Sequence, residues 1–382
     1  MQKFEKRSPV VVTEVTTKHE LRQFMQYPNR LYADNPNYIP SFYGDDLSDW
    51  TPGKNPAFDY CEARCWLAWR DGEIVGRIGA ILSHKANDKF GTHRMRFSQV
   101  DFVDDSEVSA ALFGTVERWA RQKGCDQVHG PLGFTDMDRE GMLVEGFGRR
   151  SLFITNYNAP YYPEHLTRLG YRKDVDWIEY RISVPAPGGA EAERLHKLSE
   201  FILKRKNLHV ATVHHKSEYG PFVRQVFELV NAAYAPLYGV VELSDEQIER
   251  YANKFIPLVD PDFVCFVLDE QDKLVAFGVT TLDPSPALKH SDGRLFPFGW
   301  AEVLNDLHHG DTLIMLLTAV RPDLQTEGIN AVMMDHVCQS CNRHGVQFAE
   351  TGPMLENNDH ILAQWKRLEK EQHKRRRCFI KD

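Results

Sequence analysis

The stretch Thr312–Val337, TLIMLLTAVRPDLQTEGINAVMMDHV, decides how this chain is interpreted. Its apolar run ends at Val320 and is followed by a short polar segment that contains Gln325 and Gly328. From Asn330 onward apolar residues recur at helical spacing, so the stretch predicts a strand, a tight loop and a helix. The first N–H groups of a helix have no partner inside the helix and can bind a pyrophosphate. We therefore expect a phosphate-bearing ligand at this loop.

The pattern around this stretch occurs twice in the chain. Residues 65–78, CWLAWRDGEIVGRI, and residues 265–278, CFVLDEQDKLVAFG, both read as two alternating strands joined by a polar turn. Helix-periodic segments follow at 106–123 and 329–343, and each ends at a glycine that suits a helix C-cap. Each half then has a short strand that reaches a Gly-Pro pair, a further helix (163–169 and 359–370) and a final strand (171–184 and 375–381).

Strands that alternate with helices predict an α/β protein, more closely an α+β arrangement with a mixed sheet covered by helices. The Pro/Gly-rich segment 185–190 is the expected boundary, which gives an N-terminal domain of residues 1–185 and a C-terminal domain of residues 191–382. The second half contains an insertion at 283–311 that is rich in Pro, Gly and aromatic residues. We expect this insertion to cover part of a cleft.

Composition excludes several classes of function. The chain has 382 residues, of which 42% are hydrophobic, so it can bury a large core in two or more domains. Its formal net charge of -8 argues against a general nucleic-acid surface. The one strongly basic stretch, His373–Arg377, is interpreted either as a solvated face of a terminal strand or as a patch that helps to hold a phosphorylated ligand.

The cysteines and the N-terminus indicate the compartment. Seven cysteines, an odd number, and an opening heptapeptide MQKFEKR without an apolar core predict free thiols in a reducing cytoplasm. No apolar run approaches the roughly 18 residues of a membrane span. Cys338 and Cys341 are three residues apart in a predicted helix, and we expect them to be core residues and no metal to be bound.

The segment Val320-x4-Gln325-x2-Gly328-x-Asn330, which follows a buried strand, resembles the acyl-CoA loop of the GNAT superfamily, Gln/Arg-x-x-Gly-x-Gly/Ala. Asn330 departs from this pattern. With the order of elements and the duplication, the chain from about Pro9 to Lys381 is similar to tandem GNAT proteins. The resemblance implies two GNAT-like domains, acetyl-CoA or another acyl-CoA as co-substrate, and transfer of the acyl group to a small-molecule amine.

The resemblance also assigns the residues that would hold the donor. The strand 313–320 should lie beside the strand 346–350 and splay from it. The pantetheine arm would then pair with the backbone of Thr318, Ala319 and Val320. Asn358 would contact the arm, although the residue also suits a simple helix N-cap. The pyrophosphate would lie on the loop formed by Gln325, Thr326, Glu327, Gly328, Ile329 and Asn330.

The first half departs from the family pattern. Its corresponding loop, Val103–Glu107, contains three acidic residues and no glycine, so we expect acyl-CoA only in the C-terminal domain. The first half instead carries glycine-punctuated loops with aromatic residues at 130–147 and 156–162, which suit either an acceptor surface or internal packing. The residues proposed to bind the acceptor are Phe134, Tyr157, Asn158, Tyr161 and Tyr162.

Acyl transfer to an amine needs a base, and often an acid for the leaving thiolate. Glu350, at the end of a predicted strand, is the first candidate for the base, followed by Asp136 and Glu145, with His360 as an alternative. The tyrosine acid of GNAT enzymes corresponds to Trp365 in this sequence. A thiolate with a pKa near about 8.5 can leave without much help, so this departure does not exclude catalysis.

Three functions stay open at this point. The first is an acyl-CoA-dependent N-acyltransferase with its cofactor in the C-terminal domain and its acceptor in the interdomain cleft. The second is a non-catalytic acyl-CoA or ligand sensor, or an assembly protein. The third is a Fem-like aminoacyl transferase, which the net acidity argues against because it would use charged tRNA. The acceptor, the acyl length and the oligomeric state are not determined by the sequence.

Overall fold

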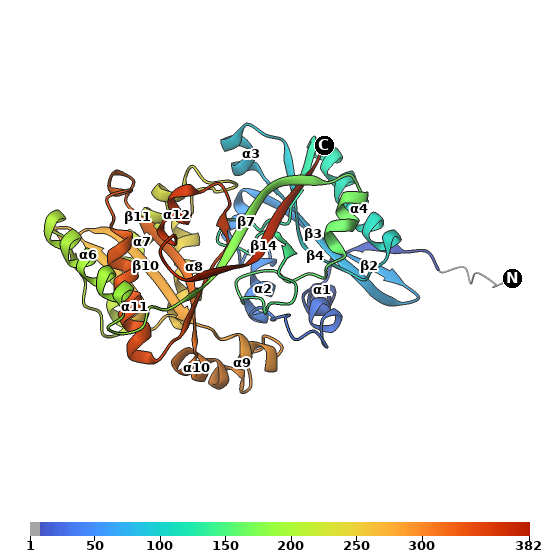
Figure 1. The fold of residues 1–382 in the computed structure, drawn as a ribbon. Coiled ribbons are helices and arrows are strands. Elements are labelled where there is room, and N and C mark those ends of the chain that lie inside the picture. The colour runs from blue at the N-terminus through green and yellow to red at the C-terminus, as the bar shows by residue number, and fades with distance from the viewer. Residues whose placement is uncertain (1–7) are drawn as a thin grey trace. The chain divides into compact units, whose positions relative to one another are not determined.

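The structure, a computed structural model, describes residues 8–382, so the opening heptapeptide lies outside the described residues. The chain forms two compact units. The first runs to Asp176 and also includes Arg376–Asp382, and the second comprises Trp177–Arg375. The chain therefore passes from one unit to the other within strands β7 (Arg172–Ser183) and β14 (Lys370–Lys381), as Figure 1 shows. This division differs from the boundary expected at 185–190, because strand pairing and not linker composition decides where these segments belong.

The first unit is a mixed sheet in the order β1-β2-β3-β4-β5-β14, in which only β4 and β5 run parallel. A short strand, β6, also pairs with β14. The elements of this unit that precede β7 are β1 (Val11–Glu14), α1 (Lys18–Leu31), α2 (Tyr43–Asp49), β2 (Cys61–Arg70), β3 (Glu73–Ser83), α3 (His84–Phe90), β4 (Arg94–Phe102), α4 (Ser106–Gln122), β5 (Gln127–Gly130), β6 (Met142–Glu145) and α5 (Tyr162–Arg168).

The second unit repeats this plan in the order β8-β9-β10-β11-β12-β7, with β11 and β12 parallel. A short strand, β13, also pairs with β7. The elements between β7 and β14 are α6 (Ala190–Lys206), β8 (His209–Val210), α7 (Gly220–Tyr234), α8 (Asp245–Phe255), β9 (Val264–Leu268), β10 (Leu274–Leu282), α9 (Ser285–His290), α10 (Gly299–His309), β11 (Thr312–Val320), α11 (Asn330–His344), β12 (Phe348–Thr351), β13 (Met354–Leu355) and α12 (Asp359–Gln364).

The two repeats exchange their last strands. β7 closes the first repeat in sequence but pairs with β12 of the second, with Ile182 opposite Ala349. β14 closes the second repeat but pairs with β5 of the first, with Phe379 opposite Gly130. Each sheet is therefore completed by a strand from the other half of the sequence.

Local sequence signals explain the turns and helix ends. Asp71 and Gly72 join β2 to β3 with φ of 52° and 82°, the backbone conformation that a two-residue hairpin requires. Gly345 ends α11 in the left-handed conformation with φ of 70°, and Gly124 follows the end of α4 with φ of 76°. The duplicated hairpins and the helices expected at 106–123 and 329–343 are confirmed.

Two expectations from the sequence need correction. α12 ends at Gln364, six residues before the expected end, and β14 begins at Lys370, five residues before the expected start. A turn separates them: the N–H of Leu368 donates to the carbonyl oxygen of Trp365 at 3.3 Å, and Lys370 Nζ donates to the same oxygen at 2.6 Å.

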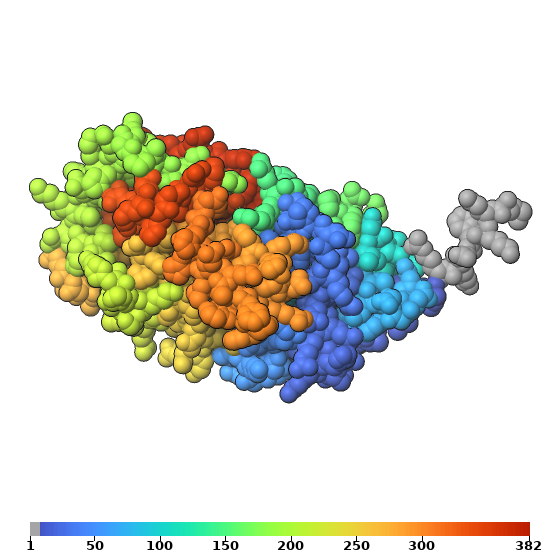
Figure 2. Space-filling model, turned by 90° about the horizontal axis from the view of Figure 1, so that it is seen from below, coloured from blue at the N-terminus to red at the C-terminus, as the bar shows by residue number. Residues whose placement is uncertain are grey.

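The insertion at 283–311 folds as the helices α9 and α10 rather than as an extended loop. Figure 2 shows this segment, in orange, at the surface. Phe296 and Phe298 between the two helices are 81% and 76% exposed, and Trp300 at the start of α10 is 48% exposed. These are the most concentrated exposed aromatic residues in the described part of the chain.

Each unit has its own apolar core. In the first, α4 packs on the sheet through Phe113 and Val116, which meet Phe97 and Phe102 of β4. In the second, Ile202 of α6 and apolar residues of α11 share a core with apolar residues of the strands β9, β10 and β11. No helix within residues 8–382 combines the length and the apolar character needed to cross a membrane.

Candidate functional site

The two parallel strands of the second unit separate partway along their length. β11 pairs with β12 only from Thr312 to Met315, whereas β11 itself continues to Val320. On this side, the backbone from Leu316 to Val320 has no strand partner in the described chain. The register between β10 and β11 also shifts between Val279 and Thr280. The expected splay of the two strands is confirmed, and it leaves a strand edge that an extended molecule could pair with.

The loop after β11 presents backbone donors. Its residues 325–328 are exposed, and Thr326 and Gly328 have φ of 69° and 84°. Ile329, the N-cap of α11, provides no side-chain cap. Within the described residues, the N–H groups of Thr326, Gly328, Ile329 and Asn330 donate to no protein acceptor. The amides at this helix start are therefore available to an anion.

Side chains around the loop limit its conformation. A Cβ at Gly328 would lie 3.0 Å from Cδ1 of Ile202 in α6, so the glycine also permits close packing of α6 on this loop. Gln325 Nε2 donates to the carbonyl oxygen of Val320 at 3.3 Å. Glu327 forms an ion pair with Lys206 at the end of α6, with 2.6 Å between Oε2 and Nζ. The side chains thus flank the loop without covering its exposed backbone.

Two further cofactor candidates have identified contacts. Asn358 accepts a hydrogen bond from the N–H of Ile361 at 3.3 Å, which makes it the N-cap of α12. The carbonyl oxygen of Thr318 accepts from the hydroxyl of Tyr234 at 2.8 Å and retains a second lone pair. Ala319 and Val320, the other two candidates on β11, are buried. Contact of these residues with a cofactor stays a prediction.

The corresponding helix start in the first unit is already satisfied. Asp105 caps α4, and its Oδ1 accepts from the N–H groups of Glu107 at 2.9 Å and Val108 at 3.4 Å. Arg70 Nη1 lies 2.5 Å from Oδ2 of the same carboxylate and, with its hydrogen bond, holds the pKa of Asp105 below its usual value. A fixed carboxylate therefore occupies in α4 the position that is open in α11.

The strand edge of the first unit is likewise occupied. β4 pairs with β5 only from Arg94 to Arg96, yet it continues to Phe102. The fully buried Tyr162 hydroxyl accepts from the N–H of Phe102 at 2.7 Å, and Tyr161 donates to the carbonyl oxygen of Phe102 at 2.5 Å. These two tyrosines, expected from the sequence as acceptor ligands, here bond to the end of β4.

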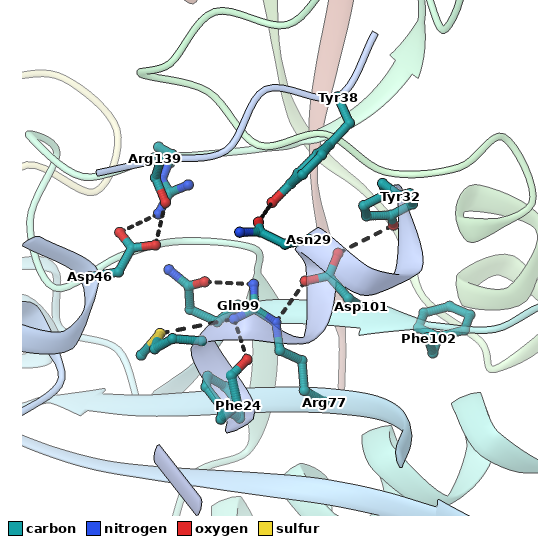
Figure 3. Close-up of polar contacts among 12 residues, drawn as sticks. Phe24, Asn29, Tyr32, Tyr38, Asp46, Arg77, Gln99, Asp101, Phe102 and Arg139 are labelled. Atoms are coloured by element: carbon teal, nitrogen blue, oxygen red, sulfur yellow. Dashed lines mark hydrogen bonds and ion pairs between the residues drawn. The ribbon is translucent and has the colours of Figure 1, made fainter. Parts of the chain in front are cut away.

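A buried polar network on β3 and β4 reinforces this arrangement (Figure 3). Arg77 Nε donates to Asp101 at 2.7 Å, and its two other nitrogens donate to the Phe24 carbonyl at 2.9 Å and to Gln99 at 3.0 Å. Tyr32, the C-cap residue of α1, donates to the other oxygen of Asp101 at 3.2 Å. Gln99 has φ of 46° within the strand. The network ties α1 to the sheet. It was not predicted from the sequence, because buried ion pairs have no characteristic spacing.

The remaining acceptor candidates have internal partners. Phe134 is 1% exposed and packs edge-on against Trp50, with ring centroids 5.1 Å apart. Asn158 accepts from the N–H of Leu143 at 2.7 Å and donates to its carbonyl oxygen at 3.0 Å. The hydroxyl of Tyr157 accepts from Asn35 at 2.7 Å. The observed contacts of these residues are packing and loop fixation, and an acceptor role stays a prediction.

The three candidate bases are divided between the two units. Glu350 lies in the second unit, and Asp136 and Glu145 lie in the first. Burial raises the pKa of Asp136 to about 6, and it raises the pKa of the nearby Glu140 well above its usual value. Glu145 ends β6 and is exposed. Asp136 thus has a pKa suited to proton transfer near neutral pH.

Glu350 is part of a buried charge cluster, which we define as Glu179, Glu350, His373 and Lys374. Glu350 lies one residue before the last pair between β11 and β12. Lys374 Nζ is 3.3 Å from Oε2 of Glu350 and 3.5 Å from Oε2 of Glu179, and His373 Nε2 is 3.7 Å from Glu350. Burial raises the pKa of Glu350, and the charge of Lys374 acts against this rise.

The basic stretch His373–Arg377 is therefore not a solvated strand face, and that interpretation was wrong. Lys374 and Arg376 are 1% and 0% exposed. Arg375 pairs with Glu356 at 2.7 Å, and Arg376 donates to the carbonyl oxygen of Asn156. Arg377 binds both carboxylate oxygens of Asp176 at 2.7 and 2.9 Å. The strand is basic because its neighbours bury acidic groups, which no sequence window around it reveals.

One group of described residues has spacing that could hold a metal ion. Ligand atoms of His129, Asp174 and Cys378 all lie within 4.8 Å of one another. Burial, together with Arg96 and Arg94, lowers the pKa of His129 well below its usual value. Arg94 also lies 3.6 Å from the Asp174 carboxylate. The positive potential of the two arginines disfavours a cation here.

The expectation that the cysteines are free thiols, and that Cys338 and Cys341 are core residues, is confirmed. All seven cysteines are free and buried. Burial raises the pKa of Cys338 to about 11 and that of Cys341 to about 12, so both are neutral thiols on the buried face of α11.

No protein-family model matches the chain. Protein YghO of Escherichia coli (strain K12) is 27% identical over 381 residues, which cover 97% of this chain and 95% of YghO. The bacterial ceramide synthase of Caulobacter vibrioides (strain NA1000 / CB15N) is 28% identical over 299 residues, which cover 77% of this chain and 75% of the synthase.

Solved structures resemble the whole chain. A tandem GNAT protein from the clavulanic acid biosynthesis pathway superposes with a TM-score of 0.54 at 14% identity, over 97% of this chain and 98% of that one. A GCN5-related N-acetyltransferase from Sphaerobacter thermophilus superposes with a TM-score of 0.52 at 12% identity, over 97% and 95%. These likenesses, the repeated order of elements and the splayed strands agree: the chain has the α/β fold of tandem GNAT proteins, the fold of GNAT-type N-acyltransferases.

Proposed function

We propose that this protein is an acyl-CoA-dependent N-acyltransferase whose donor binds to the second unit. One observation carries the proposal: the contrast between the two helix starts. Within residues 8–382, α11 begins with N–H groups that donate to no protein acceptor, and the adjoining edge of β11 has no strand partner, although Tyr234 bonds to the Thr318 carbonyl oxygen. In contrast, α4 is capped by Asp105, and both backbone groups of Phe102 at the end of β4 are bonded to Tyr161 and Tyr162. The same fold element therefore suits a diphosphate in one unit only.

The donor would use both features of the second unit. Its diphosphate would accept hydrogen bonds from the amides of Thr326, Gly328 and Asn330, where the helix dipole also favours an anion. Its pantetheine arm, which carries amide groups, would pair with the edge of β11 near Thr318 in the manner of an added strand. The thioester would then lie toward the point at which β11 and β12 separate, close in sequence register to Glu350.

Glu350 is the proposed general base. In the transfer step the acceptor amine attacks the thioester carbonyl carbon, a C–N bond forms, and the C–S bond breaks. The amine gives up one proton to the base, and the departing CoA thiolate later takes one from solvent. The raised pKa of Glu350 makes its carboxylate a better proton acceptor than an exposed glutamate. Asp136, with a pKa of about 6, is the second candidate.

For the acceptor we propose a long-chain amino alcohol. The support is the relative from Caulobacter vibrioides that is named a ceramide synthase, at 28% identity. A ceramide is the amide of a fatty acid and a long-chain amino alcohol, so its formation from acyl-CoA is the N-acyl transfer considered above. Phe296, Phe298 and Trp300 add apolar surface to the second unit, which is compatible with a substrate that carries a long alkyl chain.

A second candidate is a non-catalytic acyl-CoA sensor. It is favoured by Trp365, which stands where GNAT enzymes commonly have a tyrosine acid and is only 5% exposed. The ion pair between Glu350 and Lys374 is also compatible with a purely structural glutamate.

The test uses the full chain with acetyl-CoA, palmitoyl-CoA and free CoA, with sphinganine as the amine. Binding of the donor raises Tm in a concentration-dependent manner. An enzyme releases free thiol only when the amine is present, and mass spectrometry detects the corresponding amide. Stabilisation by acyl-CoA without thiol release across a panel of amines would favour the sensor. Absence of any stabilisation or heat of binding with CoA would refute the donor site itself.

A further inference from the structure

The C-terminal end of α6 lies against the loop that precedes α11. Ile202 of α6 packs on Gly328, where a Cβ would come within 3.0 Å of its Cδ1. One turn later, Lys206 Nζ lies 2.6 Å from Oε2 of Glu327. The two helices also share an apolar core that includes Leu195. Packing of α6 therefore places the backbone of Lys206 beside this loop.

The charges around this loop are unevenly distributed. The last turn of α6 carries three cations, Lys204, Arg205 and Lys206. The ion pair with Lys206 holds the pKa of Glu327 below its usual value, so Glu327 is ionised at neutral pH. The other acid of the loop, Asp323, is paired with Arg321, whose Nε lies 2.8 Å from its Oδ1.

Glu327 thus adds a carboxylate to a loop in which the amides of Thr326, Gly328, Ile329 and Asn330 donate to no protein acceptor in the described chain. A carboxylate beside an open anion site repels an incoming phosphate unless a cation neutralises it. Lys206 is that cation, and its ammonium group has three donors, of which Glu327 uses one. The other two donors are not used by Glu327, whose residue belongs to the same loop.

We propose that Lys206 binds a phosphate group of the CoA donor and that Glu327 is an internal competitor for the same ammonium group. The proposal rests on the proposed function, since it assigns the ligand of that site. The helix α6, which lies outside the duplicated pattern, then contributes Lys206 to the donor site. The loop can then bind a diphosphate despite the carboxylate of Glu327.

The test compares four variants by calorimetric titration with CoA at low ionic strength. Lys206→Ala is expected to weaken binding by about 10- to 100-fold, the usual effect of losing a hydrogen bond to a charged group. Glu327→Gln is expected to tighten binding several-fold, because Lys206 no longer has a competing partner. The control is Lys197→Ala on the same helix, where Lys197 is 77% exposed and 3.7 Å from Glu193, and its affinity should match the wild type. Lys206→Arg should retain most of the affinity.

A parallel titration with 3′-dephospho-CoA identifies the phosphate. An equal loss for both ligands in Lys206→Ala assigns the diphosphate, whereas a loss for CoA alone assigns the 3′-phosphate, and either result supports the proposal. Wild-type affinity in Lys206→Ala, with normal binding by the wild type, overturns this proposal and leaves the proposed function intact. If the wild type binds no CoA, the proposed function fails, and this proposal fails with it.

Discussion

Replacing Lys374 with Met tests the buried charge cluster most directly. Lys374 is fully buried and is shared by Glu179 and Glu350 at 3.5 and 3.3 Å. Methionine fills a similar volume but removes the cation, so two buried carboxylates lose their common partner. Breaking a buried ion pair from one side costs about 3–5 kcal/mol in the free energy of unfolding. For a unit of this size, that loss lowers Tm by about 6–20 °C.

The pH dependence of this penalty has a definite sign. Burial already raises the pKa of Glu350 above its value in the unfolded chain, and removal of Lys374 raises it further. A carboxyl whose pKa is higher in the folded state destabilises the fold above that folded pKa and has no such effect below the unfolded pKa. The penalty is therefore largest near about pH 8 and shrinks as the pH falls toward about 5.

The assay is thermal and urea denaturation of the wild type and of Lys374→Met at several pH values. Lys197→Met is the matched control, because Lys197 is 77% exposed and should change stability by less than about 0.5 kcal/mol. The triple change of Lys374→Met, Glu179→Gln and Glu350→Gln should recover part of the loss. A penalty below about 1 kcal/mol at pH 8, or one that does not vary with pH, would refute the reasoning.

Three further outcomes are expected. Glu350→Gln should lower the turnover of acyl transfer by at least about 100-fold, measured by thiol release, while calorimetry shows unchanged CoA affinity; near-normal turnover would eliminate Glu350 as the base. Asp105→Ala should lower the free energy of unfolding by about 1 kcal/mol in denaturant titrations, and Asp105→Asn, which keeps a cap, should cost less. The hydrogen bond to Asp335 raises the pKa of His196 in the folded protein. This hydrogen bond therefore stabilises the fold below the pKa of an unfolded histidine, and the stabilisation is lost as the pH rises through the pKa of His196 in the folded protein. The Tm of His196→Gln should therefore fall short of the wild type near about pH 6 and match it near about pH 8.5, and a constant difference would contradict this assignment.

Local features of the fold were predictable from short windows of sequence. The Asp71-Gly72 hairpin, the two long helices and their glycine ends depend on backbone preferences of a few adjacent residues. The separation of β11 from β12 was expected from the resemblance and is confirmed by their register. The cysteines in α11 were also assigned correctly, since their spacing places them on one buried face.

Features that depend on distant segments were not predictable in this way. The basic stretch that contains Lys374 was taken for surface because strand alternation does not reveal what lies on either side of a strand. Its acidic partners, Glu179 and Glu350, come from two other strands of the sheet. Likewise, no local signal predicted that the Tyr162 hydroxyl bonds to Phe102, 60 residues away in sequence, and its role as an acceptor ligand stays a prediction.

The sequence by itself determined that this chain has two copies of one α/β plan, and it predicted a phosphate-binding loop in the second copy alone. Those properties follow from periodicity and from the identities of a few neighbouring residues, such as Gly328 and Asp105. The tertiary structure alone decided that the repeats exchange their last strands, that Lys374 is buried among acids, and that Lys206 reaches the loop before α11. Each of these depends on contacts between residues far apart in the chain, which the packing of the whole unit selects and no local preference encodes.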